Sequence, residues 1–399
     1  MSFFKNLAMM PEDPILGLPI QLAEDPREKK VNLGIGAYRT AEGLPFVLSS
    51  VKKAEAKLLS SGHDKEYLPI VGHKHYLQEV KKLLLGPEDA EKCCSFEAQS
   101  IGGSGALRLI GEFLARIGTI PFLYLPEPSW PNHQQIFHFA GLQQKKYPYY
   151  NRNTHAIDFP AICEAIKEMP EHSVILLQAC CNNPTGMDPT QEQWRELSKL
   201  IKKQNIIPFF DIAYQGFGRG LEEDAFSIRQ FYQDGHELFI ANSFSKNFGL
   251  YGERVGTALF ITNDNQAAAR VGSHIKKIIR GNYSNPPLHG ALIVAAILKN
   301  AELQAEWENE LTAMRERLKA LRQELAKGLL AKGAQEFEFL LKQMGIFSYL
   351  GLNEGQVLRL KSDFAIYMPL DGRINVAGLN QENMAYVIDA ILAVHEAHS

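Results

Sequence analysis

Lys246 is the residue most suited to covalent chemistry. Aromatic and hydroxyl residues flank it in Ser-Phe-Ser-Lys-Asn-Phe, and none of these neighbours in the sequence is charged. A desolvated amine close to another cation has a lowered pKa and attacks carbonyl groups readily. Arg254 follows eight residues later and could supply the planar donor fork that suits a phosphate. Ser243, three residues before the lysine, adds a hydroxyl. The alternative is a solvated lysine in an ordinary loop.

Two further motifs place polar side chains directly after apolar runs. Asp211 ends the run Ile206–Phe210, and a carboxylate there must be solvated, paired or bonded to a ligand because burying it unpaired is costly. Tyr214 follows it by three residues. Asn183 lies in Cys-Cys-Asn-Asn-Pro-Thr-Gly, after the run Val174–Gln178. A helix cap or salt bridge for Asp211 and a plain turn for Asn183 remain the alternatives.

A glycine-rich segment, Ile101–Leu107, leads into an amphipathic helix. Gly102 and Gly103 let the backbone approach a ligand closely, and Ser104 adds a hydroxyl donor. Free N–H groups at a helix start favour an anion such as phosphate. No Lys-Ser/Thr pair of a P-loop follows, which disfavours nucleotide binding. The alternative is a glycine turn that binds nothing.

The middle of the chain alternates short apolar runs with amphipathic stretches, which predicts an α/β fold with a mostly parallel central sheet flanked by helices. The predicted strands are Val174–Gln178, Ile206–Phe210 and Leu238–Ala241. A helix capped by Thr190 and Gln193 follows the first of them. Ligands of such sheets bind outside the carboxyl ends of the strands, which is where the polar motifs occur.

A long amphipathic helix is predicted from Leu303 to Leu325, ending near Gly328 or Gly333 and connecting the central sheet to a C-terminal part. In that part Phe347–Leu352 and Gly372–Leu379 are predicted strands, and an amphipathic helix closes the chain.

Composition limits the possible functions. The 399 residues carry a net charge of −3, which gives no reason to expect nucleic-acid or membrane-surface binding. The apolar stretch Ala291–Leu298 is far shorter than the ~18 residues of a membrane span. Five cysteines without C-x-x-C spacing predict neither a disulfide framework nor a metal site, and they indicate a reduced, cytoplasmic compartment.

Together the motifs offer phosphate donors, a carboxylate, an amide, a phenol and a lysine. Pyridoxal 5′-phosphate needs this set, because its aldehyde reacts with a lysine, its ring nitrogen needs an acid partner, and its phosphate needs an arginine and backbone N–H groups. We therefore expect a pyridoxal-phosphate enzyme.

Six segments distributed between Val31 and Leu379 resemble the class I aspartate/aromatic aminotransferases, which have the type I fold of pyridoxal-phosphate enzymes. The segments are VNLGIGAYRT, CCNNPTG, DIAYQGF, SFSKNFGLYGERVG, YSNPP and GRINVAGL. The resemblance implies an N-terminal arm at residues 1–14, a small domain from 15–45 and 314–399, and a large cofactor-binding domain at 46–313.

The resemblance also assigns roles to single residues. It implies that Lys246 forms the Schiff base and moves the proton, and that Asp211 partners the ring nitrogen with support from His133. Tyr214 and Asn183 would bind the 3′-oxygen, and Trp130 would lie against the ring. The phosphate ligands would be Gly103, Ser104, Ser243 and Arg254. The substrate α-carboxylate would be bound by Arg373, with Asn183 and Gly36 beside it.

A homodimer with shared active sites is implied by two more residues. Tyr67 would reach the cofactor phosphate of the neighbouring subunit, and Arg280 would bind a distal substrate carboxylate across the interface. The alternative for Arg280 is a surface cation near Lys276 and Lys277. Phe3 and Phe4 would belong to an arm that reaches over the partner.

The sequence has features of two branches of the family that differ in substrate preference. Leu68 and Ser104 resemble the aromatic-accepting branch, whereas Asn285 and Arg280 fit dicarboxylates, so we expect activity on aspartate, tyrosine and phenylalanine with 2-oxoglutarate, in a ping-pong cycle. The alternatives are a strictly aspartate-selective enzyme, a decarboxylase or lyase of the same fold, and a non-catalytic ligand-sensing module.

Overall fold

The structure, a computed structural model, describes residues 3–10 and 17–396. Residues 1–2 and 11–16, which include much of the predicted arm and the start of the predicted small domain, lie outside the described residues, as do residues 397–399. None of the described helices combines the length and apolar character needed to cross a bilayer.

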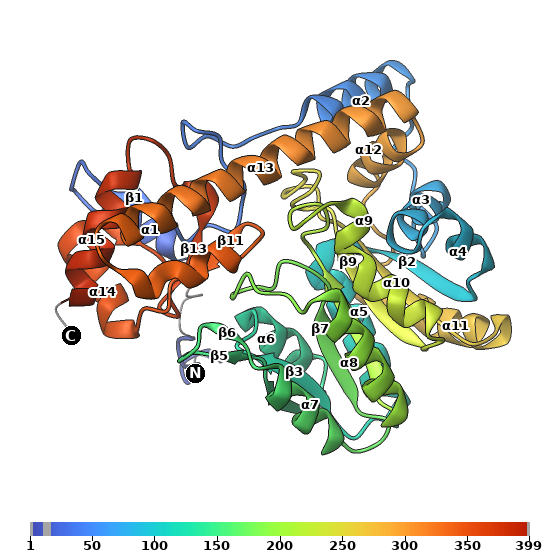
Figure 1. The fold of residues 1–399 in the computed structure, drawn as a ribbon. Coiled ribbons are helices and arrows are strands. Elements are labelled where there is room, and N and C mark those ends of the chain that lie inside the picture. Colours follow the sequence, from blue (N-terminus) through green and yellow to red (C-terminus); the bar gives the residue numbers. More distant parts are fainter. Residues whose placement is uncertain (1–2, 11–16, 397–399) are drawn as a thin grey trace.

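A seven-stranded sheet forms the centre of the molecule (Figure 1). Most neighbouring strands run parallel, as predicted, and only β10 runs antiparallel to both of its neighbours. In spatial order the strands are β2 (Ser95–Ile101), β10 (Val255–Ile261), β9 (Leu238–Ser243), β8 (Ile207–Ile212), β7 (Val174–Gln178), β3 (Leu123–Glu127) and β4 (Gln144–Pro148).

Helices cover both faces of this sheet, because its strands are apolar on both sides. In β7, Val174 and Leu176 belong to one buried cluster, while Ile175 and Leu177 belong to the other. The first face packs against α5 (Gly102–Ile117), α6 (Pro131–Phe139) and α11 (Asn265–Asn282). The second face packs against α7 (Phe159–Lys167), α8 (Gln191–Lys203) and α10 (Phe226–Gln233).

Helix α8 begins at the predicted capping box. The Gln193 N–H donates to the Thr190 hydroxyl at 3.2 Å, and the Thr190 N–H donates to the Gln193 side-chain oxygen at 2.9 Å. These two bonds satisfy N–H groups that the first helical turn leaves without partners. Trp194, Leu197 and Ile201 are buried on the face that packs against the sheet.

The long helix α13 (Ala301–Ala331) joins the central sheet to the C-terminal part, as predicted, and ends two residues before Gly333 (Figure 1). In that part, residues from both ends of the chain meet: β1 (Val31–Asn32) pairs with β12 (Ile366–Tyr367). A second short sheet joins β11 (Phe347–Tyr349) to β13 (Arg373–Asn375).

The remaining elements are short or cover the edges of these two parts. They are α1 (Leu18–Glu24), α2 (Ser49–Ser60), α3 (Lys74–Leu85), α4 (Pro87–Lys92), β5 (Tyr150–Asn151), β6 (Ala156–Ile157), α9 (Leu221–Asp224), α12 (His289–Leu298), the 3₁₀ helices η1 (Gln335–Lys342) and η2 (Val376–Gly378), α14 (Glu354–Phe364) and α15 (Met384–Glu396).

Several predicted boundaries were wrong. Strand β9 continues to Ser243, beyond the predicted Ala241, and β11 ends at Tyr349, before the predicted Leu352. Strand β8 includes Asp211 and Ile212, because these residues pair with Ala241 and Asn242 of β9. The glycine segment is not a loop before the helix, since α5 begins at Gly102. The predicted strand Gly372–Leu379 is extended only at Arg373–Asn375, after which the Asn375 side chain accepts a bond from the Ala377 N–H and the chain turns into η2.

Candidate active site

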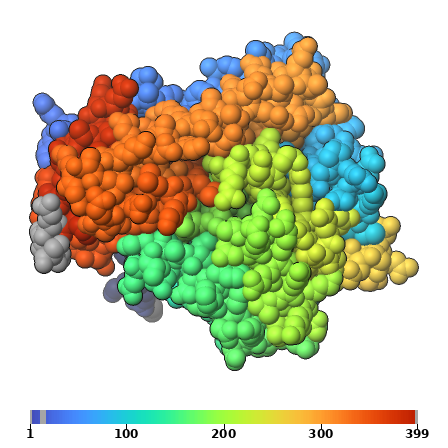
Figure 2. All heavy atoms as spheres, in the orientation of Figure 1, coloured from blue at the N-terminus to red at the C-terminus, as the bar shows by residue number. Residues whose placement is uncertain are grey.

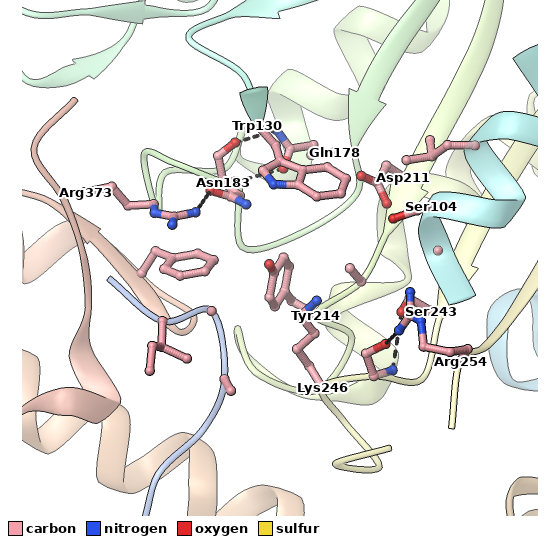
Figure 3. Close-up of a pocket in the computed structure, with 18 residues that line it drawn as sticks. Ser104, Trp130, Gln178, Asn183, Asp211, Tyr214, Ser243, Lys246, Arg254 and Arg373 are labelled. Carbon is pink, nitrogen blue, oxygen red and sulfur yellow. Dashed lines mark hydrogen bonds between the residues drawn. The ribbon is translucent and has the colours of Figure 1, made fainter. Parts of the chain in front are cut away.

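A cavity of about 360 Å³ lies where the motifs at the strand ends meet the C-terminal part. Figure 3 shows Arg254 and Ser243 at one end of it, Arg373 at the other, and the ring of Trp130 between Asn183 and Asp211. Of the residues predicted for a site within one chain, all but His133 line the cavity: Gly36, Gly103, Ser104, Trp130, Asn183, Asp211, Tyr214, Ser243, Lys246, Arg254 and Arg373.

Lys246 follows β9 and lies half-buried beside the cavity, with its Nζ 5.5 Å from the centre of the Tyr214 ring. Burial disfavours the charged ammonium, and Arg254 and Arg373 disfavour it further, while Asp211 favours it. The net result lowers the pKa of Lys246 to about 8. Neither its amine nor the Tyr214 hydroxyl bonds to another described residue, so both remain available to a ligand.

Asp211 is held by a chain of hydrogen bonds behind the cavity. Its Oδ2 lies 2.7 Å from His133 Nε2, and His133 Nδ1 lies 2.7 Å from the Ser129 hydroxyl. His133 is fully buried, and its ring lies nearly perpendicular to that of Trp130, with 5.2 Å between the ring centres. The carboxylate is therefore fixed in position with one oxygen free to face the cavity. Sequence reasoning predicted the support from His133 but missed Ser129, for which no motif gave a signal.

Arg254 ends the lysine loop with a left-handed backbone, at φ 54°, which is unusual for a residue with a side chain. Its carbonyl accepts a bond from the Gly102 N–H at 3.0 Å. Its Nη1 donates to the Ser245 hydroxyl at 3.2 Å and to the Tyr251 carbonyl at 3.0 Å. The guanidinium is thereby aimed at the start of α5, next to the N–H groups that begin the helix.

Glycine is required at the start of α5 because there is no room for a side chain. A Cβ on Gly102 would lie 2.5 Å from Arg254 Nη2, and a Cβ on Gly103 would lie 2.9 Å from the Ser243 Cβ. Arg254, Ser243, Ser104 and the backbone N–H groups that follow Gly102 thus form a compact set of donors. Such a set, at a helix start, suits a phosphate group.

Arg373 forms the opposite end of the cavity and is only 2% exposed. Its Nη1 donates to Asn183 Oδ1 at 2.9 Å, and its Nη2 donates to the Gly34 carbonyl at 3.4 Å. The guanidinium also lies 4.2 Å from the centre of the Phe347 ring. Its Nε is buried and has no partner among the described residues, which leaves a donor for a carboxylate.

Sequence reasoning missed several residues of the cavity wall. Gln178, the last residue of β7, donates to the Asn183 carbonyl at 3.0 Å and accepts from its N–H at 2.8 Å, so it fixes the turn that carries Asn183. Its position at a strand end was the available signal. The other unpredicted wall residues are Ile35, Ala37, Leu107, Ala213, Ser245 and Phe347.

Tyr67 and Arg280 do not line the cavity of their own chain. Tyr67 is 83% exposed. Arg280 is also exposed, near the end of α11, where it donates to the Ser284 hydroxyl. Phe3 and Phe4 are 91% and 69% exposed.

The family model described as aminotransferase class I and II matches residues 28–391. Aspartate aminotransferase from Escherichia coli K12 is 46% identical, covering 98% of this chain and 100% of that protein. A crystal structure of an aromatic-amino-acid aminotransferase from Burkholderia pseudomallei, covalently bound to pyridoxal phosphate, has a TM-score of 0.95 at 42% identity and covers 99% and 100% of the two chains. Aspartate aminotransferase from Saccharomyces cerevisiae cytoplasm has a TM-score of 0.96 at 37% identity, covering 100% and 99%.

Proposed function

The chain belongs to the class I and II aminotransferase family, and we propose that it transfers the α-amino group of L-aspartate, tyrosine or phenylalanine to 2-oxoglutarate. The observation that carries the proposal is the meeting, in one cavity, of Lys246, Asp211, Arg254 and Arg373. Between the sheet end and the C-terminal part, these four residues supply an amine, a carboxylate and two cations.

Pyridoxal phosphate is the cofactor of this enzyme, and the residues present fit it. Arg254 and Ser243 lie so close to Gly102 and Gly103 that no side chain fits at these two positions. Together with Ser104 they form a set of donors that suits a phosphate. At a different part of the wall, the Asp211 carboxylate suits a protonated ring nitrogen. When bound, the cofactor supplies an aldehyde that condenses with amino groups and a ring that withdraws electrons from the substrate Cα.

The residues of the chain divide the remaining work among them. Asp211, held by His133 and Ser129, would accept a hydrogen bond from the ring nitrogen and thereby keep that nitrogen protonated. Tyr214 and Asn183 would donate hydrogen bonds to the 3′-oxygen. The Lys246 amine removes the proton from the substrate Cα and returns it later, a task to which a pKa of about 8 is well matched.

Arg373 binds the substrate α-carboxylate. Its Nη1 is held by Asn183, and its free Nε lets it donate to an incoming oxygen without breaking an existing bond. Binding therefore pairs a cation that is already desolvated, which strengthens the interaction. Gly36 and Trp130 also line the cavity, where they would help to orient the substrate and exclude water, with Trp130 against the cofactor ring.

A range of substrates that includes both aspartate and aromatic amino acids is part of the proposal. Support comes from the presence of both aspartate and aromatic aminotransferases among the similar proteins. Leu68 and Asn285 lie together, since the Asn285 amide donates to the Leu68 carbonyl at 3.3 Å. Leu68 would make the site more apolar and Ser104 would make it roomier, both of which favour a ring, whereas Arg280 would bind a distal carboxylate.

The proposed assembly is a homodimer in the cytoplasm, with each chain organised as the arm, small domain and large domain described above. The exposure of Tyr67, Arg280 and Phe3 outside the cavity of their own chain supports a role across an interface. The five cysteines are all free, which suits a reducing compartment.

The direct test is borohydride treatment of the purified holoprotein followed by peptide mass mapping, which should place the cofactor adduct on Lys246. Lys246→Ala should lose at least about a hundredfold in kcat with aspartate, because a positioned base contributes 10²–10⁴-fold. Lys277→Ala, a surface lysine on α11, is the matched control and should keep full activity. An adduct on another lysine, or unchanged turnover in Lys246→Ala, would refute the proposal.

A further inference from the structure

A second cavity, of about 340 Å³, lies behind the walls of the active site. It is formed by α13, by the segment Phe217–Arg219 that follows Tyr214, and by Leu341–Gly345 ahead of β11. Figure 2 shows α13 in orange packed against the yellow-green segment before α9 on the visible face of the molecule. Its volume falls in the range of small-molecule sites.

The side chains around this cavity are strongly cationic. Five of them are basic, Arg219, Arg315, Lys319, Arg322 and Lys342, against the single acid Glu316. The Glu316 carboxylate lies 3.5 Å from Arg315 and 3.9 Å from Lys319, both long contacts. Among the described residues, no carboxylate lies within ion-pair distance of the other three cations. Three of the five cations thus have no ion-pair partner in the described part of the chain.

Arg322 is the most constrained of these cations, because it is 3% exposed. Its Nε donates to the Ser348 hydroxyl at 2.8 Å, and its Nη2 donates to the Gly345 and Phe347 carbonyls. Its Nη1 donates to no other described residue. A buried guanidinium without a carboxylate is costly, and burial lowers the pKa of Arg322 to about 10.

The cavity walls continue directly into the active site. Arg315 Nη1 donates to the Gly216 carbonyl at 3.1 Å, two residues after Tyr214. Gly345 comes two residues before Phe347, whose ring lies 5.7 Å from that of Tyr214. A molecule in the second cavity would thus touch α13 and the backs of two segments that contact the substrate site.

We propose that this second cavity binds a small multivalent oxyanion, recognised by Arg322 at the base and by Arg315, Lys319 and Lys342 at the rim. Guanidinium and ammonium groups bind phosphate and carboxylate oxygens through charge-assisted hydrogen bonds, so either group of oxyanions has the required chemistry. The site is separate from the transamination chemistry, since no residue that lines it is shared with the active-site cavity.

The test is calorimetric titration of the holoenzyme with pyrophosphate in one arm and citrate in the other, which distinguishes phosphate from carboxylate ligands. The double variant Lys319→Glu/Lys342→Glu reverses two exposed rim charges and should weaken binding at least about tenfold, an effect that high salt reduces. The matched control, Lys199→Glu/Lys203→Glu, makes the same net change at two exposed sites on α8, away from this cavity, and should bind as wild type does.

Three outcomes would overturn the proposal. Wild type could bind neither anion, both double variants could lose affinity equally, or the rim variant could bind as tightly as wild type with the anion competing against the amino-acid substrate. The last result would place the anion in the active site. Because binding is read directly, failure here leaves the transaminase test at Lys246 unaffected.

Discussion

At the scale of single residues, Lys246 owes its proposed reactivity to the groups around it. Loss of water around its ammonium is the largest cause of the lowered pKa. Asp211 raises the pKa, whereas Arg254 and Arg373 lower it further. Since the folded-state pKa of about 8 is below the ordinary 10.5, the neutral amine forms as the pH rises through about 8. Ordinary surface lysines stay protonated over that range.

We therefore predict that, in protein freed of cofactor, Lys246 reacts with an amine-selective reagent with a midpoint near pH 8. Peptide mapping after short exposures at pH 6 to 11 would give the modification profile of each lysine. Lys277, an exposed lysine on α11, serves as the internal reference for the reagent. A Lys246 profile that coincides with that of Lys277 would show that burial does not lower its pKa.

Ser129 gives a second prediction at this scale, because it touches only His133 in the hydrogen-bond chain to Asp211. Ser129→Ala should lower kcat by roughly fivefold, which corresponds to the ~1 kcal/mol of one hydrogen bond. Its KM for amino acids should not change, since substrate binding depends on Arg373. Steady-state kinetics separate the two parameters, and Ser129→Thr, which keeps the hydroxyl, should restore kcat. A change confined to the melting temperature would make the serine merely structural.

At the scale of elements, the start of α5 and the lysine loop are built against each other. Gly102 has a φ of 66°, and Arg254 closes over it. Helix α13 supports the same loop from the other side, since Trp307 is fully buried, donates to the Asn247 carbonyl at 2.8 Å and stacks on Phe248. The residues around Lys246 are thus fixed by two helices that are distant in sequence.

Gly102→Ala should weaken cofactor binding by about tenfold or more, because the new Cβ would displace the Arg254 guanidinium. Gly118→Ala is the matched control: its φ of 64° carries the same backbone cost of about 1–2 kcal/mol, but nothing lies within 4 Å of the new Cβ. Both variants should lose similar unfolding free energy in urea, and only Gly102→Ala should lose cofactor on dialysis. Equal cofactor retention would contradict the close fit.

At the scale of the whole molecule, the proposed dimer makes a prediction that a single chain cannot satisfy. Arg280→Leu should lose mainly dicarboxylate activity, and Lys246→Ala should lose at least about a hundredfold with every substrate. Refolding the two variants together should recover activity with aspartate, because a mixed dimer has one site with both Lys246 and Arg280. A statistical mixture would reach roughly a quarter of the wild-type rate.

Measured alone, neither variant should reach this rate with aspartate, and Arg280→Leu alone should still turn over tyrosine. If the mixture recovers nothing while size-exclusion chromatography shows mixed dimers, Arg280 does not act across an interface. A monomeric protein at assay concentration would contradict the shared site altogether.

The sequence by itself predicted several residues that line the active-site cavity and the approximate ends of the strands that carry them. Lys246, Asp211, Asn183 and Arg254 were predictable because each is in a short motif next to an apolar run, and parallel strands present their carboxyl ends at one edge. The capping box at Thr190 was predictable because its two partners are only three residues apart in the sequence. Arg373 was assigned only through resemblance to a family.

Only the tertiary structure decided how these residues support one another. His133 reaches Asp211 across 78 positions, and Arg373 reaches Asn183 across 190. The cationic cavity at Arg322 likewise exists only because α13 packs beside two loops far from it in sequence. Local periodicity and turn residues encode contacts within a few positions, whereas these contacts depend on the packing of whole elements against the sheet.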